Sequence, residues 1–203
     1  MHVDKVIDAC LNLSHDQKEG CLFVVESEKP AFRYYKDFNA DIFRKNNRRL
    51  SVFEDKDKQL IRQLAAVDGA TIINHKGELI HYGATLVNAE KVIGHGKRHA
   101  FAMGTSKKVK GAVCILASEE DHHVRAFTAG VCIADIDGET RLNVSTRQKV
   151  AEILGAPITK TLVSAGIATS ILASLNPALA ILTISGSYVM VSEGFNKLKF
   201  LIK

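Results

Sequence analysis

Three short motifs carry residue types that suit a metal ion and a polyphosphate. Residues 68–70 are Asp-Gly-Ala, residues 94–99 are Gly-His-Gly-Lys-Arg-His, and residues 118–120 are Ser-Glu-Glu. Carboxylates bind divalent cations, whereas glycine-rich basic loops let backbone N–H groups and arginine side chains reach phosphate oxygens. Together and in this order, the three motifs indicate nucleotide chemistry.

The first motif centres on Asp68, which follows a predicted helix and precedes a predicted strand. At such a turn its carboxylate can bind a divalent cation or take a proton from a sugar hydroxyl. Gly69 and Ala70 lack the bulk that would keep a ligand away from the backbone. An Asp-Gly pair by itself usually does no more than form a turn, so the other two motifs are needed for a functional interpretation of Asp68.

The second motif joins two glycines to four basic or imidazole side chains. Gly96 lets backbone N–H groups approach phosphate oxygens, Arg98 offers a fork of donors, and His99 can donate a hydrogen bond or a proton. A helix that begins near Arg98 would also point its positive end at the anion. The alternative is a loop with solvated basic side chains. Residues 118–120 follow a predicted strand and can present a carboxylate at the same sheet edge.

Composition favours an ordinary globular protein that binds a small anion. The formal net charge is +5 and the pI is near 9.0, but basic residues are dispersed among acidic ones and aromatics make up 6%. We therefore expect no nucleic-acid partner. The four cysteines are scattered among apolar neighbours, which predicts buried free thiols in a reducing compartment. No secretory h-region is apparent at the N-terminus, so a cytoplasmic location is expected.

Apolar spacing and turn signals predict an α/β chain. Residues 3–11 and 58–66 show the apolar stripes of helices, and residues 21–25 form a short apolar run typical of a buried strand. A hairpin is expected around residues 75–77. Further strands are expected at residues 112–116, 124–127, 131–136 and 141–144, the last two joined by a tight turn at Asp137 and Gly138.

The C-terminal part is predicted to be helical. Residues 145–148 resemble a capping box that begins a helix over residues 146–154. Residues 161–192 contain no charged side chain, and Asn176 and Pro177 interrupt them. Two shorter helices hinged at the proline are therefore expected. They form either a hairpin packed on the domain or on a partner subunit, or a segment associated with a membrane.

The fold class expected is thus α/β, with a central mixed sheet flanked by helices and a C-terminal apolar helical extension. Residues 1–144 are expected to form the α/β domain. Residues 145–203 are expected to form the extension, which either mediates oligomerisation or associates with a membrane.

The three motifs together resemble the diadenylate cyclase domain, also called the DisA N-terminal domain, which makes cyclic di-AMP from two ATP molecules. The resemblance covers roughly residues 3–144. It implies an α/β fold with a central mixed sheet, and an enzyme in which two ATP-loaded subunits meet face to face. It therefore implies ATP as substrate, Mn²⁺ or Mg²⁺ as cofactor, and self-association as a dimer or higher oligomer.

The resemblance also implies roles for individual residues. Asp68 would bind the metal and help to deprotonate the ribose 3′-hydroxyl, while Arg98 and His99 would grip the triphosphate and stabilise the leaving pyrophosphate. Family members usually carry Leu at the position of His95 and Thr or Ala at that of Lys97. The residues expected to contact the nucleotide are Gly69, Ala70, Thr85, Leu86, Gly96, Lys97, Ser118, Glu119 and Glu120.

The leading functional hypothesis is a metal-dependent diadenylate cyclase, a nucleotidyltransferase that releases pyrophosphate. One alternative is a non-catalytic module of the same fold that binds or senses a nucleotide. Another is a membrane-associated interaction protein in which the apolar tail is the functional part.

Overall fold

The computed structural model describes residues 3–15, 17, 19–27, 32–36, 49–86, 96–138, 143–156 and 179–180. The described helices and strands follow one another along the chain with these bounds: α1 Val3–His15, β1 Cys21–Val25, a 3₁₀ helix Phe32–Tyr34, β2 Tyr35–Lys36, α2 Asp55–Ala65, β3 Ala70–Ile73, β4 Leu79–Leu86, α3 Lys97–Lys108, β5 Val113–Ala117, β6 His123–Thr128, β7 Val131–Asp137, α4 Val144–Gly155 and β8 Leu179–Ala180.

The strands form one mixed sheet in the order β2-β4-β3-β1-β5-β6-β7-β8. β1 pairs in parallel with β3, and every other pairing among the described strands is antiparallel. The parallel pair needs a crossover connection, and α2 lies within it. The predicted α/β class with a central mixed sheet is therefore confirmed.

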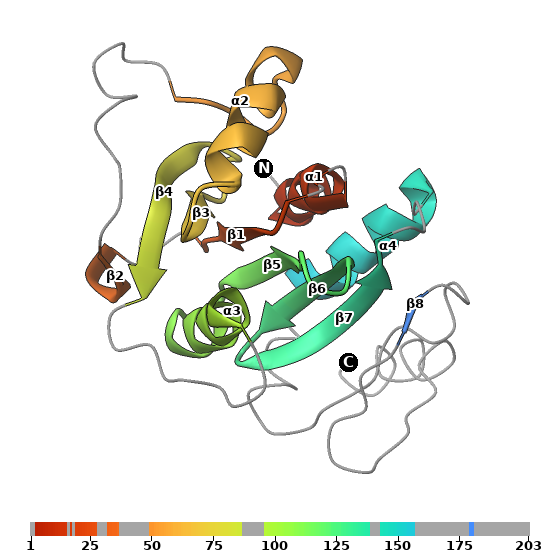
Figure 1. Ribbon diagram of the computed structural model, residues 1–203. Coiled ribbons are helices and arrows are strands. Elements are labelled where there is room, and N and C mark those ends of the chain that lie inside the picture. The colour runs from red at the N-terminus through yellow and green to blue at the C-terminus, as the bar shows by residue number, and fades with distance from the viewer. Residues whose placement is uncertain are drawn as a thin grey trace, which may run out of the picture.

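Helices cover both faces of the sheet (Figure 1). α1, α2 and α4 contribute buried side chains to one apolar core, whereas α3 contributes to a second core on the opposite face. β1 is buried at every position because it lies between these cores. Its residues alternate between them, with Phe23 in the first core and Leu22 and Val24 in the second. This explains why the sequence of β1 is a continuous apolar run.

The last helix begins earlier than its predicted capping box. Asn143 is the N-cap, and its side-chain Oδ1 accepts the N–H of Thr146 at 2.8 Å. Ser145 is therefore already inside α4, and the capping-box prediction was wrong. Val150, Ala151 and Leu154 of this helix belong to the same core as α1. The proposed division of the chain between residues 144 and 145 stays a prediction.

Gly138, in the predicted turn at Asp137 and Gly138, follows the end of β7 in a turn, and a second tight turn that was not predicted lies between β6 and β7. Ala129 and Gly130 join β6 to β7 with φ angles of 52° and 82°. Positive φ at both central residues matches the right-handed twist of a hairpin. The predicted strand at residues 141–144 was wrong at Asn143 and Val144, which cap and begin α4. Residues 141 and 142 lie outside the described residues.

The apolar tail contributes a strand where a helix was predicted. Leu179 and Ala180 form β8, which pairs with Ile136 and Asp135 of β7. This pairing satisfies backbone groups that would otherwise be exposed at the outer edge of β7. The rest of residues 161–192 lies outside the described residues. Within the described part of the chain, no helix combines the length and the apolar character needed to cross a membrane.

The α4 cap yields a first test. Asn143→Ala should lower the free energy of unfolding by about 1 kcal/mol, because the N–H of Thr146 loses its acceptor. Ser145→Ala is the matched control, and it should change the free energy by less than about 0.5 kcal/mol. Urea unfolding curves of both variants check this. A larger loss for Ser145→Ala would instead support the capping box.

Candidate functional site

The three predicted motifs meet in one cavity of about 780 Å³. It is lined by Asp68, by Gly96, Lys97, Arg98 and His99, and by Ser118, Glu119 and Glu120. Asp68 precedes β3, Ser118 follows β5, and α3 begins between them in sequence. Sequence analysis thus predicted eight of the side chains or backbone positions that surround this pocket.

Asp68 lines the pocket and is followed by a glycine at which a side chain would be strained. Gly69 has φ +105°, and a Cβ there would lie 2.6 Å from the backbone carbon of Gly83. Gly83 itself has φ 64° at an irregularity in the pairing of β3 with β4. The exposed carboxylate of Asp68 accepts the Gly69 N–H at 3.1 Å. The close approach of the two glycines therefore fixes where this carboxylate emerges.

Three other predicted contact residues, Gly69, Ala70 and Thr85, are not among the residues that line this cavity. Ala70 is fully buried and pairs with Ala84. The Thr85 hydroxyl donates to the carbonyl of Lys36 at 3.3 Å. Leu86 pairs with Tyr35. Because Ala70 pairs with Ala84, the end of β4 lies beside the start of β3, next to Asp68.

The start of α3 presents backbone donors to the pocket. Gly96 is the N-cap, and the helix begins at Lys97, one residue before the predicted start. The first N–H groups of an α-helix have no partner within the helix and carry its positive dipole end. His99 also lies in the first turn of α3, and its ring packs edge-on against Phe127 at a centroid distance of 5.0 Å. This end of α3 therefore suits an anion.

Arg98 links the elements around the pocket. Its Nη2 donates to the carbonyl of Ala66 at 3.4 Å, and its Nη1 lies 3.9 Å from Glu119 Oε2. A Cβ on Gly20, the residue before β1, would come within 2.4 Å of Nη1, so the guanidinium occupies the space that a side chain at this position would need. Its buried Nε has no hydrogen-bond partner among the described residues. The terminal nitrogens of Arg98 thus face Ala66 and Glu119, and its side chain lines the pocket.

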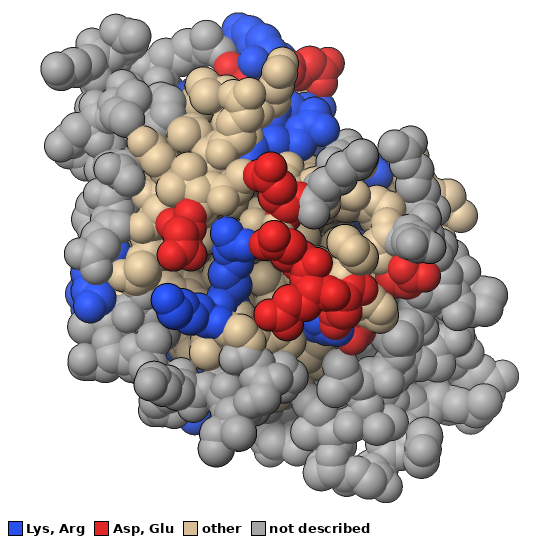
Figure 2. Space-filling model, viewed as in Figure 1, with Lys and Arg blue, Asp and Glu red and all other residues tan. Residues whose placement is uncertain are grey.

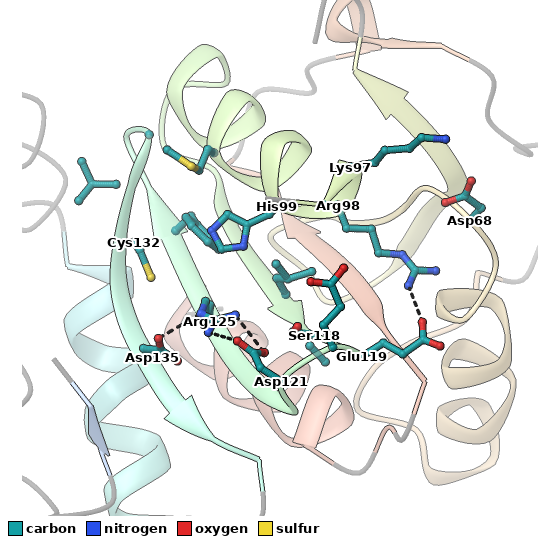
Figure 3. A pocket seen from close by; sticks show the side chains of 18 residues that line it. Asp68, Lys97, Arg98, His99, Ser118, Glu119, Asp121, Arg125, Cys132 and Asp135 are labelled. Carbon is teal, nitrogen blue, oxygen red and sulfur yellow. Dashed lines mark hydrogen bonds and ion pairs between the residues drawn. The ribbon is translucent and has the colours of Figure 1, made fainter. Parts of the chain in front are cut away.

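The opposite wall of the pocket contains charged residues that sequence analysis missed. Arg125 lies between Asp121 and Asp135 (Figure 3). Its Nε donates to Asp135 Oδ2 at 3.0 Å, and both of its terminal nitrogens donate to Asp121. The hydrogen bonds from Arg125 hold the pKa of the Asp121 carboxyl well below its usual range. This wall is therefore acidic and internally paired.

A bulge brings Asp135 to the pocket. Phe127 pairs with Cys132 and Ala126 pairs with Ala134, so β7 contains one extra residue at this point. Strict alternation would place Cys132 and Asp135 on opposite faces of the sheet, but both line the pocket. Burial raises the pKa of the Cys132 thiol to about 12, so this thiol is neutral. The four cysteines are free thiols as predicted, and three of them are buried.

The described residues hold no ready-made metal centre. No three of their His, Cys, Asp or Glu side chains gather in a way that could bind a metal ion. A cation at this pocket would thus take its remaining ligands from a bound molecule or from water. Figure 2 shows acidic and basic side chains side by side near the middle of the face that it views.

Gly69 offers a test of how Asp68 is positioned. Gly69→Ala should destabilise the fold by about 1 to 3 kcal/mol, because the new Cβ meets backbone at a positive φ. The control is Gly96→Ala, where φ is −65° and the nearest atom would be Glu120 Oε1 at 3.6 Å. That variant should lose less than about 1 kcal/mol. If chemical denaturation shows equal losses of unfolding free energy for both variants, the close packing of Gly69 against Gly83 does not determine stability.

Comparisons with known proteins agree with this arrangement. The chain matches the family model described as DAC, DisA bacterial checkpoint controller nucleotide-binding, over residues 7–132. A diadenylate cyclase of Methanocaldococcus jannaschii is 27% identical over 142 residues, which cover 66% of this chain and 44% of that protein. The chain thus matches less than half the length of this relative.

Two solved structures are similar to this chain at lower sequence identity. DacA from Staphylococcus aureus has a TM-score of 0.49 at 18% identity, covering 73% of this chain and 93% of that chain. A hypothetical membrane spanning protein from Bacillus cereus has a TM-score of 0.46 at 22% identity, covering 61% of this chain and 58% of that chain. The family assignment rests instead on the family model, which matches more than half of the residues. The chain therefore belongs to the DAC family of DisA bacterial checkpoint controller nucleotide-binding domains.

Proposed function

We propose that this chain is a metal-dependent diadenylate cyclase that condenses two ATP molecules into cyclic di-AMP and two pyrophosphates. The observation that carries the proposal is the single cavity in which Asp68, the start of α3 and the Ser118–Glu120 segment come together. The family assignment and the similarity to a diadenylate cyclase support the same activity.

The start of α3 is proposed to bind the triphosphate. Gly96 and Lys97 present backbone N–H groups there, and Arg98 adds a guanidinium that lines the pocket. Lys97 is exposed at the pocket and adds a positive charge. Donors fixed in this way stabilise charge that develops on a leaving pyrophosphate, because they need not reorganise during the reaction. His99, which lines the same wall, is proposed to donate a further hydrogen bond.

Asp68 is proposed to act at the ribose. Its carboxylate is exposed on the rim of the pocket and fixed by Gly69, so it can accept the proton of the 3′-hydroxyl. The 3′-oxygen then forms a bond to the α-phosphorus of the second nucleotide, and the bond from that phosphorus to pyrophosphate breaks. A second transfer in the opposite direction closes the ring. Ser118, Glu119 and Glu120 are proposed to line the nucleotide on the other side.

The charge of the pocket supports a requirement for a divalent cation. Among the described residues, its lining contains two more acidic than basic side chains, and these would repel a free ATP anion. Asp68 fits a nucleotide-bound Mg²⁺ or Mn²⁺, since such ions take one or two carboxylates together with phosphate oxygens. When bound, the ion would neutralise phosphate charge. The charged residues are Asp68, Glu119, Glu120, Asp121 and Asp135 against Lys97, Arg98 and Arg125.

Self-association is part of the proposal. One pocket contains one Asp68 and one α3 start, whereas the cyclic product joins two nucleotides through two equivalent bonds. Two copies that face each other would supply the second nucleotide to each pocket. Turnover should therefore depend on protein concentration when the copies are dilute.

The first test is product formation. Purified protein is incubated with ATP and Mn²⁺ or Mg²⁺, and cyclic di-AMP is detected by chromatography with mass detection. Asp68→Asn should abolish product while ATP still binds, because the amide cannot accept the proton. The matched control is Asp55→Asn, which lies in the first turn of α2 outside the pocket and should leave turnover unchanged. Unchanged turnover in Asp68→Asn would contradict its role, and ATP binding without product in the unmodified protein would favour a nucleotide-sensing module.

The second test removes the cation. ATP affinity measured by calorimetry should fall at least about tenfold when EDTA replaces Mg²⁺, because the net acidic pocket then faces an uncompensated polyanion. Adenosine, which carries no charge, serves as the control and should bind equally in both buffers. Equal ATP affinity with and without the cation would contradict the electrostatic argument.

A further inference from the structure

We propose that Arg125 is a positioning residue that holds the loop between β5 and β6 in the shape the nucleotide pocket needs. This inference rests on the proposed function, because the loop carries Ser118, Glu119 and Glu120 into the pocket. Arg125 lies on β6 and belongs to none of the three sequence motifs.

Arg125 is anchored to the sheet by Asp135. The two residues are directly opposite each other in the pairing of β6 with β7, and their side chains are 14% and 10% exposed. Asp135 also contacts His123 Nδ1 through its second oxygen, at 2.6 Å. A carboxylate with this degree of burial needs its partners, because burial penalises an isolated charge. The guanidinium is therefore fixed by the rigid part of the sheet.

The other side of the guanidinium holds the loop. Both terminal nitrogens of Arg125 donate to the carboxylate of Asp121, the residue directly after Glu120. Asp121 Oδ1 in turn accepts the backbone N–H of His123 at 3.3 Å. The Ser118 N–H donates to the His123 carbonyl at 2.8 Å, which closes the loop. Arg125 thus connects the sheet to Asp121, at the C-terminal end of the segment that lines the pocket.

The position of this loop matters for Arg98. Glu119 lies on the loop, and its Oε2 is 3.9 Å from Arg98 Nη1. A shift of the loop would move this carboxylate relative to the guanidinium proposed to bind phosphate. Small displacements of such groups weaken catalysis strongly, because binding and transition-state contacts depend on their placement.

Arg125 is not itself suited to bind phosphate. Nε and both terminal nitrogens already donate to the carboxylates of Asp121 and Asp135. Two carboxylates around one guanidinium leave a negative charge, which repels a phosphate group. Its contribution is therefore expected to pass through the loop.

The test combines hydrogen exchange with steady-state kinetics on the full chain. Arg125→Met keeps most of the side-chain length but removes the charge and the donors. Amide exchange at residues 118–123 should rise about tenfold, while exchange in β1 and α1 stays unchanged. KM for ATP should rise about tenfold in the same variant. Arg125→Lys, which restores the charge without the fork, should recover part of both effects.

Arg147→Met is the matched control. Arg147 forms a comparable ion pair, with its Nε 2.6 Å from Asp8 Oδ1 and its side chain 18% exposed, but it joins α4 to α1 away from the pocket. This variant should leave exchange at residues 118–123 and KM for ATP unchanged. Hydrogen exchange at residues 118–123 is measured without turnover. If the unmodified protein makes no product, the proposed cyclase activity is refuted, and the exchange measurement alone decides this inference.

Two results would overturn the inference. One is unchanged exchange at residues 118–123 in a folded Arg125→Met protein. The other is raised exchange with an unchanged KM for ATP. If Arg125→Met does not fold, Asp121→Asn replaces it, since the amide preserves the shape and leaves the pair between Arg125 and Asp135 intact. Asp121→Asn should raise both the amide exchange at residues 118–123 and the KM for ATP. If either quantity stays unchanged, the inference is overturned.

Discussion

The arrangement of the pocket depends on the pairing of β1 on both of its edges. β1 is parallel to β3 and antiparallel to β5, so the start of β1, the start of β3 and the end of β5 lie at one edge of the sheet. Gly20, Asp68 and Ser118 are the residues directly outside these strand ends, or within two positions of them. Because β1 is buried between two apolar cores, it cannot shift in register without exposing one of them. The common edge is therefore fixed by core packing.

Close approaches of backbone then place the charged groups at this edge. Gly69 lies so close to the backbone of Gly83 that a Cβ on Gly69 would collide with it. The Arg98 guanidinium lies similarly close to Gly20, where a Cβ would collide with Nη1. These close contacts allow the Asp68 carboxylate and the Arg98 guanidinium to line the same cavity. The guanidinium also donates a hydrogen bond to the carbonyl of Ala66. The charged wall formed with Asp121 and Arg125 faces them across the pocket (Figure 3). The cavity thus carries charged groups of both signs on its two walls, which suits a polyanion that arrives with a cation.

Sequence analysis predicted much of this site but missed the acidic wall. Asp68, Arg98 and Glu119 could be found because their motifs combine special residue types over short spans. Asp135 could not be found in this way, since the bulge in β7 reverses its expected face. Gly20 was also missed, because a glycine before a strand is common and its packing partner lies far away in sequence. The N-cap of α4 was misplaced by two residues because Asn143 and Ser145 are both good caps, and only the backbone geometry separates them.

The sequence by itself determined the class of fold, the buried strands and the candidate chemistry of the three motifs. Those features depend on periodicity and on local residue types, which are complete within short segments. Only the tertiary structure decided that the motifs share one cavity, that Arg125 is held between Asp121 and Asp135, and that Leu179 and Ala180 extend the sheet. The physical reason is that strand register, bulges and close glycine contacts arise from pairings between distant segments, and no local pattern specifies them.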